Sequence, residues 1–221
     1  MKIRREDSAR TRERLIAAAS EVFAEKDYSI ATIAEICERA EANVAAVNYH
    51  FGDKETLYRE AWRNAFRTSV QAHPADGGVS DNAPPEERLR GMVVAVLGRI
   101  TDESNKEFFI VLRELASPTG LLDEVMETEL LPMHQRMETV VHELLGPRSS
   151  RTQVQFCTIS IINQCVSAIF ARNSERPGGN DNKAFPPKID DVDAYAEHVV
   201  QFSLGGIRAI LDKALREYKR P

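Results

Sequence analysis

Apolar residues recur at steps of three and four positions along almost the whole chain, which is the spacing of amphipathic helices. No stretch shows the apolar–polar alternation that is typical of a half-buried strand. The first helical pattern begins at Ser8 and is expected to stop near Asp27, and a longer one is expected from Asp53 to about His73. The sequence therefore predicts an all-α fold of about nine helices.

Two short helices are expected between these longer ones, each with a recognisable start. Thr32 and Glu35 match a capping box, and the helix behind them is predicted to end near Ala40. Asn43 is a favoured N-cap for the next helix, which is predicted to run through Phe51. The inner side of that helix is expected to carry Val44, Val47 and Phe51.

Composition changes at Pro74, where a stretch rich in proline, glycine, aspartate and asparagine extends to Pro85 and predicts a linker. Residues 173–187 have a similar composition and are expected to form a mobile loop. Five further helices are expected, over residues 85–101, 105–117, 121–145, 151–172 and 190–219. The predicted division is a small N-terminal unit, a connecting helix and a larger helical bundle, at residues 1–53, 54–74 and 85–221.

Composition and charge narrow the class of protein. The 221 residues are 43% hydrophobic and 29% charged, which is ordinary for a soluble globular protein. The 29 Lys and Arg stand against 34 Asp and Glu, and the net charge of -5 excludes proteins that hold nucleic acid by bulk charge alone. Three scattered cysteines favour a reducing compartment, and no secretion signal or membrane-spanning run is apparent. We therefore expect a cytoplasmic protein without a membrane partner.

The two short helices have the proportions of a helix-turn-helix, whose second helix enters the major groove of DNA. This second helix is expected to expose residues suited to base edges, since asparagine can pair with adenine and alanine can touch the thymine methyl group. Tyr49, His50 and Lys54 are suited to donate to phosphates. On pattern alone, a plain helical corner explains these two helices equally well.

Three segments resemble the N-terminal domain of the TetR/AcrR family of transcriptional regulators: residues 14–26 (RLIAAASEVFAEK), 32–36 (TIAEI) and 48–58 (NYHFGDKETLY). The string NVAAVNYHFGDKE at 43–55, with FIVLRELASPT at 109–119, is further similar to the CecR-type subgroup. The resemblance implies a homodimeric transcription factor, by analogy a repressor, which binds a palindromic operator in double-stranded DNA. It also implies a small-molecule effector that binds in the C-terminal bundle and loosens the grip on DNA.

Two residues depart from the family's pattern, because Asp27 and Glu41 stand where the family usually has glycine. Glycine is favoured at such turns because it adopts positive φ without strain. Glu41 is therefore expected either to accept that strain or to belong to a differently shaped turn. It also brings a negative charge close to DNA.

Basic residues crowd the N-terminus, where we expect an arm that reaches the DNA backbone or the minor groove. A solvated, frayed terminus is the alternative interpretation. The predicted recognition helix itself contains no Lys or Arg, so sequence choice is expected to depend on its asparagines and Tyr49. The full predicted DNA-binding set is Arg4, Arg5, Arg10, Thr32, Asn43, Ala45, Ala46, Asn48, Tyr49, His50 and Lys54.

The C-terminal helices are expected to pair two subunits and to bind the effector. Glycine in mid-helix is costly unless another helix packs closely against it, so the predicted dimer residues are Ser203, Gly205, Gly206 and Ile210. Close packing within one subunit is the alternative. The candidate effector-binding residues are Phe108, Phe109, Leu112, Arg113, Met133, Met137 and Gln164. An apolar core explains the large side chains as well, and a structural ion pair explains Arg113.

A regulator has two alternatives, an enzyme and a helical adaptor. An enzyme is not expected, because the sequence contains no nucleophile elbow, P-loop, dinucleotide fingerprint or HExxH motif. His134, Glu138 and His142 share a helix face but span too many turns for one ion, so no metal or cofactor is expected. A helical protein–protein adaptor with a degenerate DNA-binding head is the remaining alternative.

Overall fold

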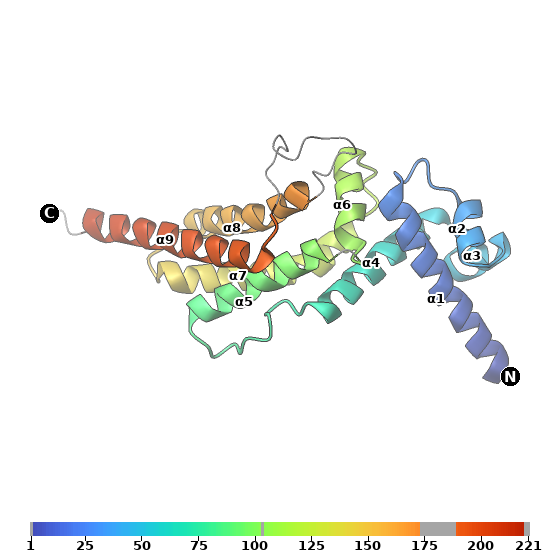
Figure 1. The fold of residues 1–221 in the computed structure, drawn as a ribbon, viewed down its shortest axis with the longest axis horizontal. Helices are drawn as coiled ribbons and strands as arrows, with labels where there is room; N and C mark the ends of the chain where they lie inside the picture. The colour runs from blue at the N-terminus through green and yellow to red at the C-terminus, as the bar shows by residue number, and fades with distance from the viewer. Residues whose placement is uncertain (1, 103, 173–188, 219–221) are drawn as a thin grey trace. The chain divides into compact units, whose positions relative to one another are not determined.

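The computed structural model describes residues 2–102, 104–172 and 189–218, and within these ranges the backbone forms nine α-helices and no β-strand (Figure 1). The predicted all-α class is confirmed. The helices are α1 (Lys2–Glu25), α2 (Ile33–Arg39), α3 (Val44–Phe51), α4 (Lys54–Ala72), α5 (Pro85–Thr101), α6 (Glu107–Ala116), α7 (Asp123–Leu145), α8 (Arg151–Arg172) and α9 (Val192–Tyr218). The loop predicted over residues 173–187 lies outside the described residues.

The chain forms two compact units. The first comprises Met1–Gln71 and Glu103–Leu130, and the second comprises Ala72–Asp102 and Leu131–Pro221. Because α6 packs on α1, it belongs to the first unit rather than to the bundle in which the sequence placed it. The domains predicted from sequence are continuous segments, whereas each compact unit combines two separate segments of the chain.

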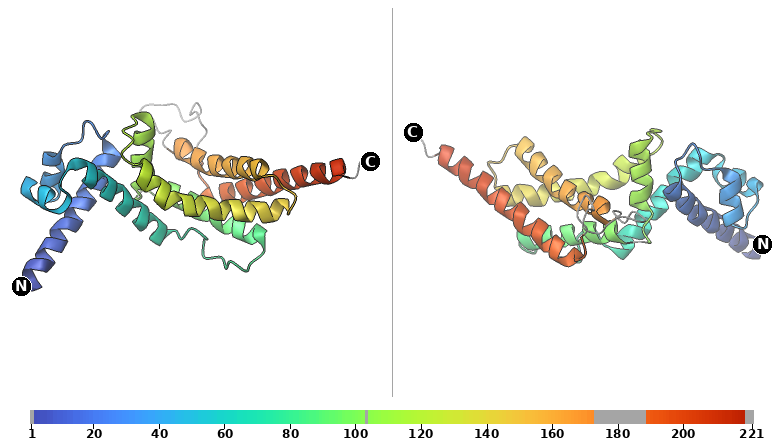
Figure 2. Two further views of the ribbon diagram at one scale, coloured as in Figure 1. Left: turned by 180° about the vertical axis from the view of Figure 1, so that it is seen from behind. Right: turned by 45° about the horizontal axis from the view of Figure 1, so that its top comes forward.

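The first helix is longer than the sequence pattern suggests. α1 begins at Lys2 instead of Ser8 and ends at Glu25, close to its expected end. Its C-terminal half buries apolar residues that include Leu15 and Phe23. The early turns contain Lys, Arg, Glu and Ala, which favour helix even without an apolar face. These early turns extend beyond α2 and α3 (Figures 1 and 2).

Both predicted caps of the short helices are present. The hydroxyl of Thr32 accepts a hydrogen bond from the backbone N–H of Glu35 at 3.2 Å, and Oδ1 of Asn43 accepts one from Ala46 at 2.9 Å. Each bond satisfies one N–H group that the start of a helix leaves without a helical partner. The carboxylate of Glu35 does not complete the capping box, since Lys26 Nζ donates to both of its oxygens at 2.8 Å.

The core of the first unit centres on α4. Leu57, Tyr58 and Trp62 are almost completely buried, and the ring of Tyr58 meets Phe23 of α1 edge-on with centroids 4.6 Å apart. The buried hydroxyl of Ser20 donates to the backbone oxygens of α1 and α4, so this polar group is satisfied inside the core. These contacts hold α4 against α1.

The second unit is built on α5, which packs against both α8 and α9 (Figure 2). Two ion pairs link α5 to its neighbours. Arg90 of α5 binds Glu197 of α9, and Arg88 of α5 binds Glu143 of α7. The segment before α5 is held by a close backbone contact. A Cβ atom on Gly77, at φ +62°, would lie 2.3 Å from the backbone oxygen of Gly91.

Candidate nucleic-acid interface

α2 and α3 form a helix-turn-helix with a closed apolar inner side. Ile36 and Cys37 of α2 are buried, as are Val47 and Phe51 of α3. Val44 was expected on the same side, but its side chain is 49% exposed. It occupies the first position of α3, where the partner helix no longer covers it. The prediction was therefore wrong for Val44 and right for the other two residues of α3.

The outward side of α3 is polar or small except for Val44, and such a side suits a major groove. Tyr49 is the most prominent residue there, with 79% of its surface exposed and its ring edge-on to His50 at 4.9 Å. Ala46 and His50, which belong to the predicted DNA-binding set, are half-buried. The structure brings together five exposed residues at this surface: Asn43, Val44, Ala45, Asn48 and Tyr49.

Three residues of the predicted set already have partners within the protein. Thr32 and Asn43 use their side-chain oxygens as helix caps. Lys54 Nζ donates to the backbone oxygen of Tyr28 and lies 4.2 Å from the centre of its ring, and burial lowers the pKa of this ammonium group. A phosphate contact by Lys54 therefore has to compete with Tyr28.

The basic N-terminus is helical rather than an extended arm, because residues 2–7 continue α1. Arg10 is exposed, whereas Arg12 binds Glu60 of α4 at 2.8 Å and lies 5.3 Å from the ring centre of Phe51. The side chains of Arg4 and Arg5 lie outside the described residues. Arg10 is thus the member of the predicted arm whose exposure the structure establishes.

The two departures from glycine have different outcomes. Glu41 has φ +48°, and no other non-glycine residue within the described ranges has a positive φ. Glu41 therefore accepts the left-handed conformation. Asp27 does not; its carboxylate pairs instead with Arg113 of α6 at 3.3 Å. An acidic residue at position 27 thus links the loop after α1 to α6.

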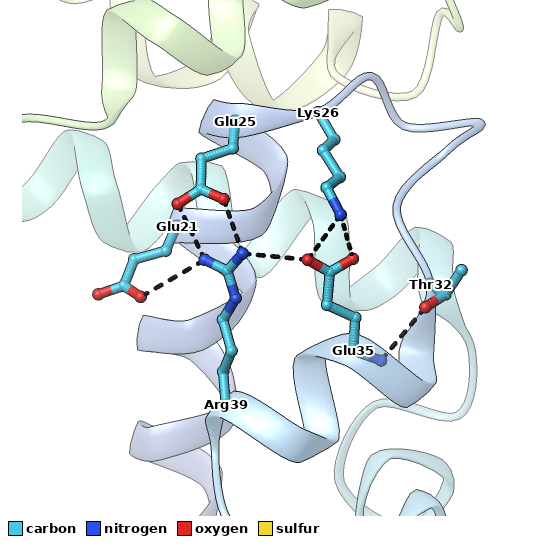
Figure 3. A network of polar contacts seen from close by, with 6 residues as sticks. All are labelled: Glu21, Glu25, Lys26, Thr32, Glu35 and Arg39. Atoms are coloured by element: carbon cyan, nitrogen blue, oxygen red, sulfur yellow. Dashed lines mark hydrogen bonds and ion pairs between the residues drawn. The ribbon is translucent and has the colours of Figure 1, made fainter.

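An ionic network joins the C-terminal end of α1 to α2 (Figure 3). Arg39 donates to both carboxylate oxygens of Glu25, at 2.9 and 2.7 Å, and to Glu35 at 3.0 Å. These guanidinium bonds hold the pKa of Glu25 below its usual range, and the bonds from Lys26 do the same for Glu35. The sequence reasoning missed this network, although the spacing of Glu35 and Arg39 at i and i+4 was a local signal of it.

Comparison with known proteins identifies the family. The model for the N-terminal domain of bacterial regulatory proteins of the TetR family matches residues 15–61, which hold the helix-turn-helix. The model for the C-terminal domain of the HTH-type transcriptional dual regulator CecR matches residues 85–207, more than half of the chain. The chain belongs to the TetR family and has a CecR-type C-terminal domain. It is accordingly a DNA-binding transcriptional regulator and not an enzyme.

Relatives of this TetR-family chain agree with that identification. The dual regulator CecR of Shigella flexneri is 27% identical over 167 residues, which cover 71% of this chain and 74% of CecR. The transcriptional repressor NicS of Pseudomonas putida is 29% identical over 94 residues, covering 42% of this chain and 43% of NicS. A TetR-like regulator from Rhodococcus sp. RHA1 has the same fold, with a TM-score of 0.65 at 16% identity over 90% of this chain and 96% of that one.

Helix α6 of this TetR-family protein is tied to the helices of the DNA-binding unit. Arg113 Nε donates to the backbone oxygen of Ala24 in α1 at 2.7 Å, in addition to its ion pair. This arrangement matches the ion-pair alternative for Arg113 and leaves its guanidinium committed to α1. Glu114, which is buried, accepts hydrogen bonds from the Tyr58 hydroxyl of α4 and from Thr119 and Gly120. The candidate effector residues Phe108, Phe109 and Leu112 on α6 are half-buried.

The remaining candidates lie in the second unit. Met137 is buried and Met133 is half-buried, with its sulfur 3.5 Å from Arg99 Nη1. Gln164 of α8 donates to Ser203 of α9 at 3.4 Å, so the side chain of Ser203 faces its own subunit. The predicted dimer residues Gly205 and Gly206 are exposed, and a Cβ atom on either would meet nothing within 4 Å. Ile210 is half-buried.

Neither a metal site nor a membrane-spanning helix is found among the described residues. His134 Nε2 lies 3.5 Å from Glu138, but no three His, Cys, Asp or Glu side chains within the described ranges gather as a metal site would require. Over the same ranges, none of the helices has the length and apolar character needed to cross a bilayer.

Proposed function

We propose that this TetR-family regulator is a homodimeric repressor that binds a palindromic operator and is released by a small-molecule effector. The observation that carries the proposal is the exposed side of α3, where Asn48 and Tyr49 stand beside Ala45. These residue types suit base edges in a major groove. A single helix-turn-helix reads one half-site, so a symmetric pair of heads suits a palindrome. Such a regulator would act in the cytoplasm, where bacterial DNA lies.

The proposed dimer contact is the apolar surface shared by α8 and α9. Phe156 and Ile159 of α8 and Phe202 of α9 are exposed, and the exposed Gly205 and Gly206 follow Phe202 by about one turn of α9. Exposed clusters of large apolar side chains mark interaction surfaces, and glycines allow a second helix to approach closely. A second copy of the same surface would form a four-helix contact.

The proposed response to the effector involves α6. Phe108, Phe109 and Leu112 are the proposed effector contacts on this helix. Arg113 and Glu114 bind α6 to α1 and to α4, so a displacement of α6 would disturb the helices that support α3. Coupling of this kind requires the effector to bind one arrangement of α6 better than the other.

Selection from a library of random duplex DNA at near-physiological salt tests the proposal. We expect enrichment of a palindromic motif, bound by two protein chains per duplex, and loss of that enrichment in Tyr49→Ala. Enrichment of a single half-site by one chain would overturn the dimer and the palindrome. The absence of any enriched sequence, even at low salt, would favour the helical adaptor.

A further inference from the structure

A cation from α1 reaches the turn between α2 and α3, where the acidic residue Glu41 lies. Arg14 of α1 reaches this turn, where Nη2 donates to the backbone oxygen of Glu41 at 3.4 Å and Nη1 lies 3.5 Å from its carboxylate. Glu41 is two residues before Asn43, the N-cap of α3. In helix-turn-helix proteins the N-terminal end of the second helix approaches the bases, with phosphates on either side of it. The pair therefore lies where DNA phosphates would come close.

The contact of Arg14 is loose in comparison with those of the neighbouring arginines. Arg12 makes a 2.8 Å bond to Glu60, and Arg39 holds Glu25 through two bonds of 2.9 and 2.7 Å. Arg14 makes two long contacts to a carboxylate whose side chain is 85% exposed. Exposed pairs of this kind contribute little stability in water, so either member can exchange partners readily.

We propose that Glu41 limits the affinity of this protein for DNA by competing with the phosphate backbone for the guanidinium of Arg14. In the free protein, Arg14 is occupied by the turn. On DNA, the guanidinium of Arg14 exchanges between Glu41 and a phosphate. The negative charge of Glu41 neutralises part of the positive charge that would otherwise displace counterions from DNA. Arg12 and Arg39 cannot take this role, because their short bonds fix α1 to α4 and α2 to α1.

This inference rests on the proposed binding of operator DNA and adds to it a residue that sets the strength of binding. The left-handed conformation of Glu41 gives it a structural basis. A glycine would satisfy that backbone without strain and without charge, so the glutamate adds strain and negative charge to the turn that carries α3. At a given salt concentration, the affinity for any duplex is therefore lower, whether or not its sequence matches the operator.

The test measures binding to one fixed duplex of mixed sequence, and to the selected operator, as a function of salt. The variants are Glu41→Gln, which removes the charge, and Glu41→Asn, whose short side chain also tolerates positive φ. Both are made in the natural chain and in an Arg14→Gln background. Glu38→Gln, an exposed α2 position outside the Arg14 contact, controls for the change in net charge.

We expect Glu41→Gln and Glu41→Asn to tighten binding to both duplexes by about 3- to 10-fold, with a steeper dependence of log K on log [salt], by up to about 0.9 for one more phosphate contact. In the Arg14→Gln background the gain should largely disappear. An equal gain in that background, or from Glu38→Gln, would overturn the competition and leave only general repulsion. Tight binding by the natural protein with no gain in either variant would also overturn it. No binding by the natural protein at any salt would overturn the proposed operator binding as well.

Discussion

The outward surfaces of α3 and of α8 with α9 are both left uncovered, yet they differ in chemistry. α3 presents amide, phenol and methyl groups, whereas α8 and α9 expose Phe156, Ile159 and Phe202 together with two glycines of α9. Polar groups remain stable in water until DNA arrives, while a cluster of large apolar groups is stabilised by being covered. The proposed function uses this contrast, with α3 contacting DNA intermittently and the apolar surface covered by a second subunit.

The largest effect is expected when the apolar surface is broken. Phe202→Asp places a charge that two copies would have to bury together, which costs several kcal/mol. We expect a dimer seen by light scattering to become a monomer, and operator binding to fall by more than about 100-fold, since a lone head contacts half of the site. Gln201→Glu adds a charge at the exposed position just before Phe202. It should leave the oligomeric state and operator binding almost unchanged. A dimeric Phe202→Asp protein would show that this surface is not the contact.

A smaller loss, in the free energy of unfolding, is expected when the hydrogen bonds of Glu114 are removed. Glu114 accepts hydrogen bonds from Tyr58, Thr119 and Gly120 while buried, so Glu114→Gln leaves donors without a matching acceptor. We expect urea denaturation to show a free energy of unfolding lower by about 1–3 kcal/mol. Glu124→Gln, at an exposed position of α7, serves as the control and should stay within about 0.5 kcal/mol. Equal stability of the two variants would contradict a supporting role for Glu114.

A still smaller effect is expected at the exposed surface of α3. Asn48→Ala should remove a base contact and reduce discrimination between the operator and a scrambled duplex by about 1–2 kcal/mol. Binding to the scrambled duplex should change little. Asn64→Ala, an exposed asparagine of α4, is the matched control and should alter neither. A uniform weakening on both duplexes would assign Asn48 to the phosphate backbone instead.

The smallest effect is expected in the turn that precedes α3. Glu41→Gly removes the strain of a left-handed glutamate. Thermal unfolding should therefore show a free energy of unfolding higher by about 1 kcal/mol. Gly52→Ala is the inverse control, because Gly52 has φ +80° and the added methyl group should destabilise by a similar amount. A destabilised Glu41→Gly protein would mean that the Arg14 contact outweighs the strain.

Local signals explain what the sequence predicted well. Thr32 and Asn43 mark helix starts because each cap bonds to an N–H group three residues away, within one short stretch of sequence. The exposed positions of α3 follow from helical spacing and from the burial of Val47 and Phe51. The family resemblance then supplied the DNA-binding role, which spacing alone left open.

Long-range contacts explain what the sequence did not predict. Arg113 and Asp27 are far apart in the chain, and no periodic pattern indicates that they meet. Lys54 is predicted to bind phosphate because it starts a helix. Its partner in the structure is Tyr28, which lies in the loop between α1 and α2. The extra turns of α1 were missed because they carry no apolar stripe, although their residues favour helix.

The contact between Gly77 and Gly91 restricts how the sequence of this protein can vary. A side chain at either position would strike the backbone of the segment that faces it, so neither glycine can be replaced while the other residues stay in place. Engineers who wish to insert an affinity tag or a fluorescent domain should therefore avoid this segment, although its composition is that of an ordinary surface linker. The evolutionary expectation is the same, since drift at these two sites requires the loop and α5 to move apart first.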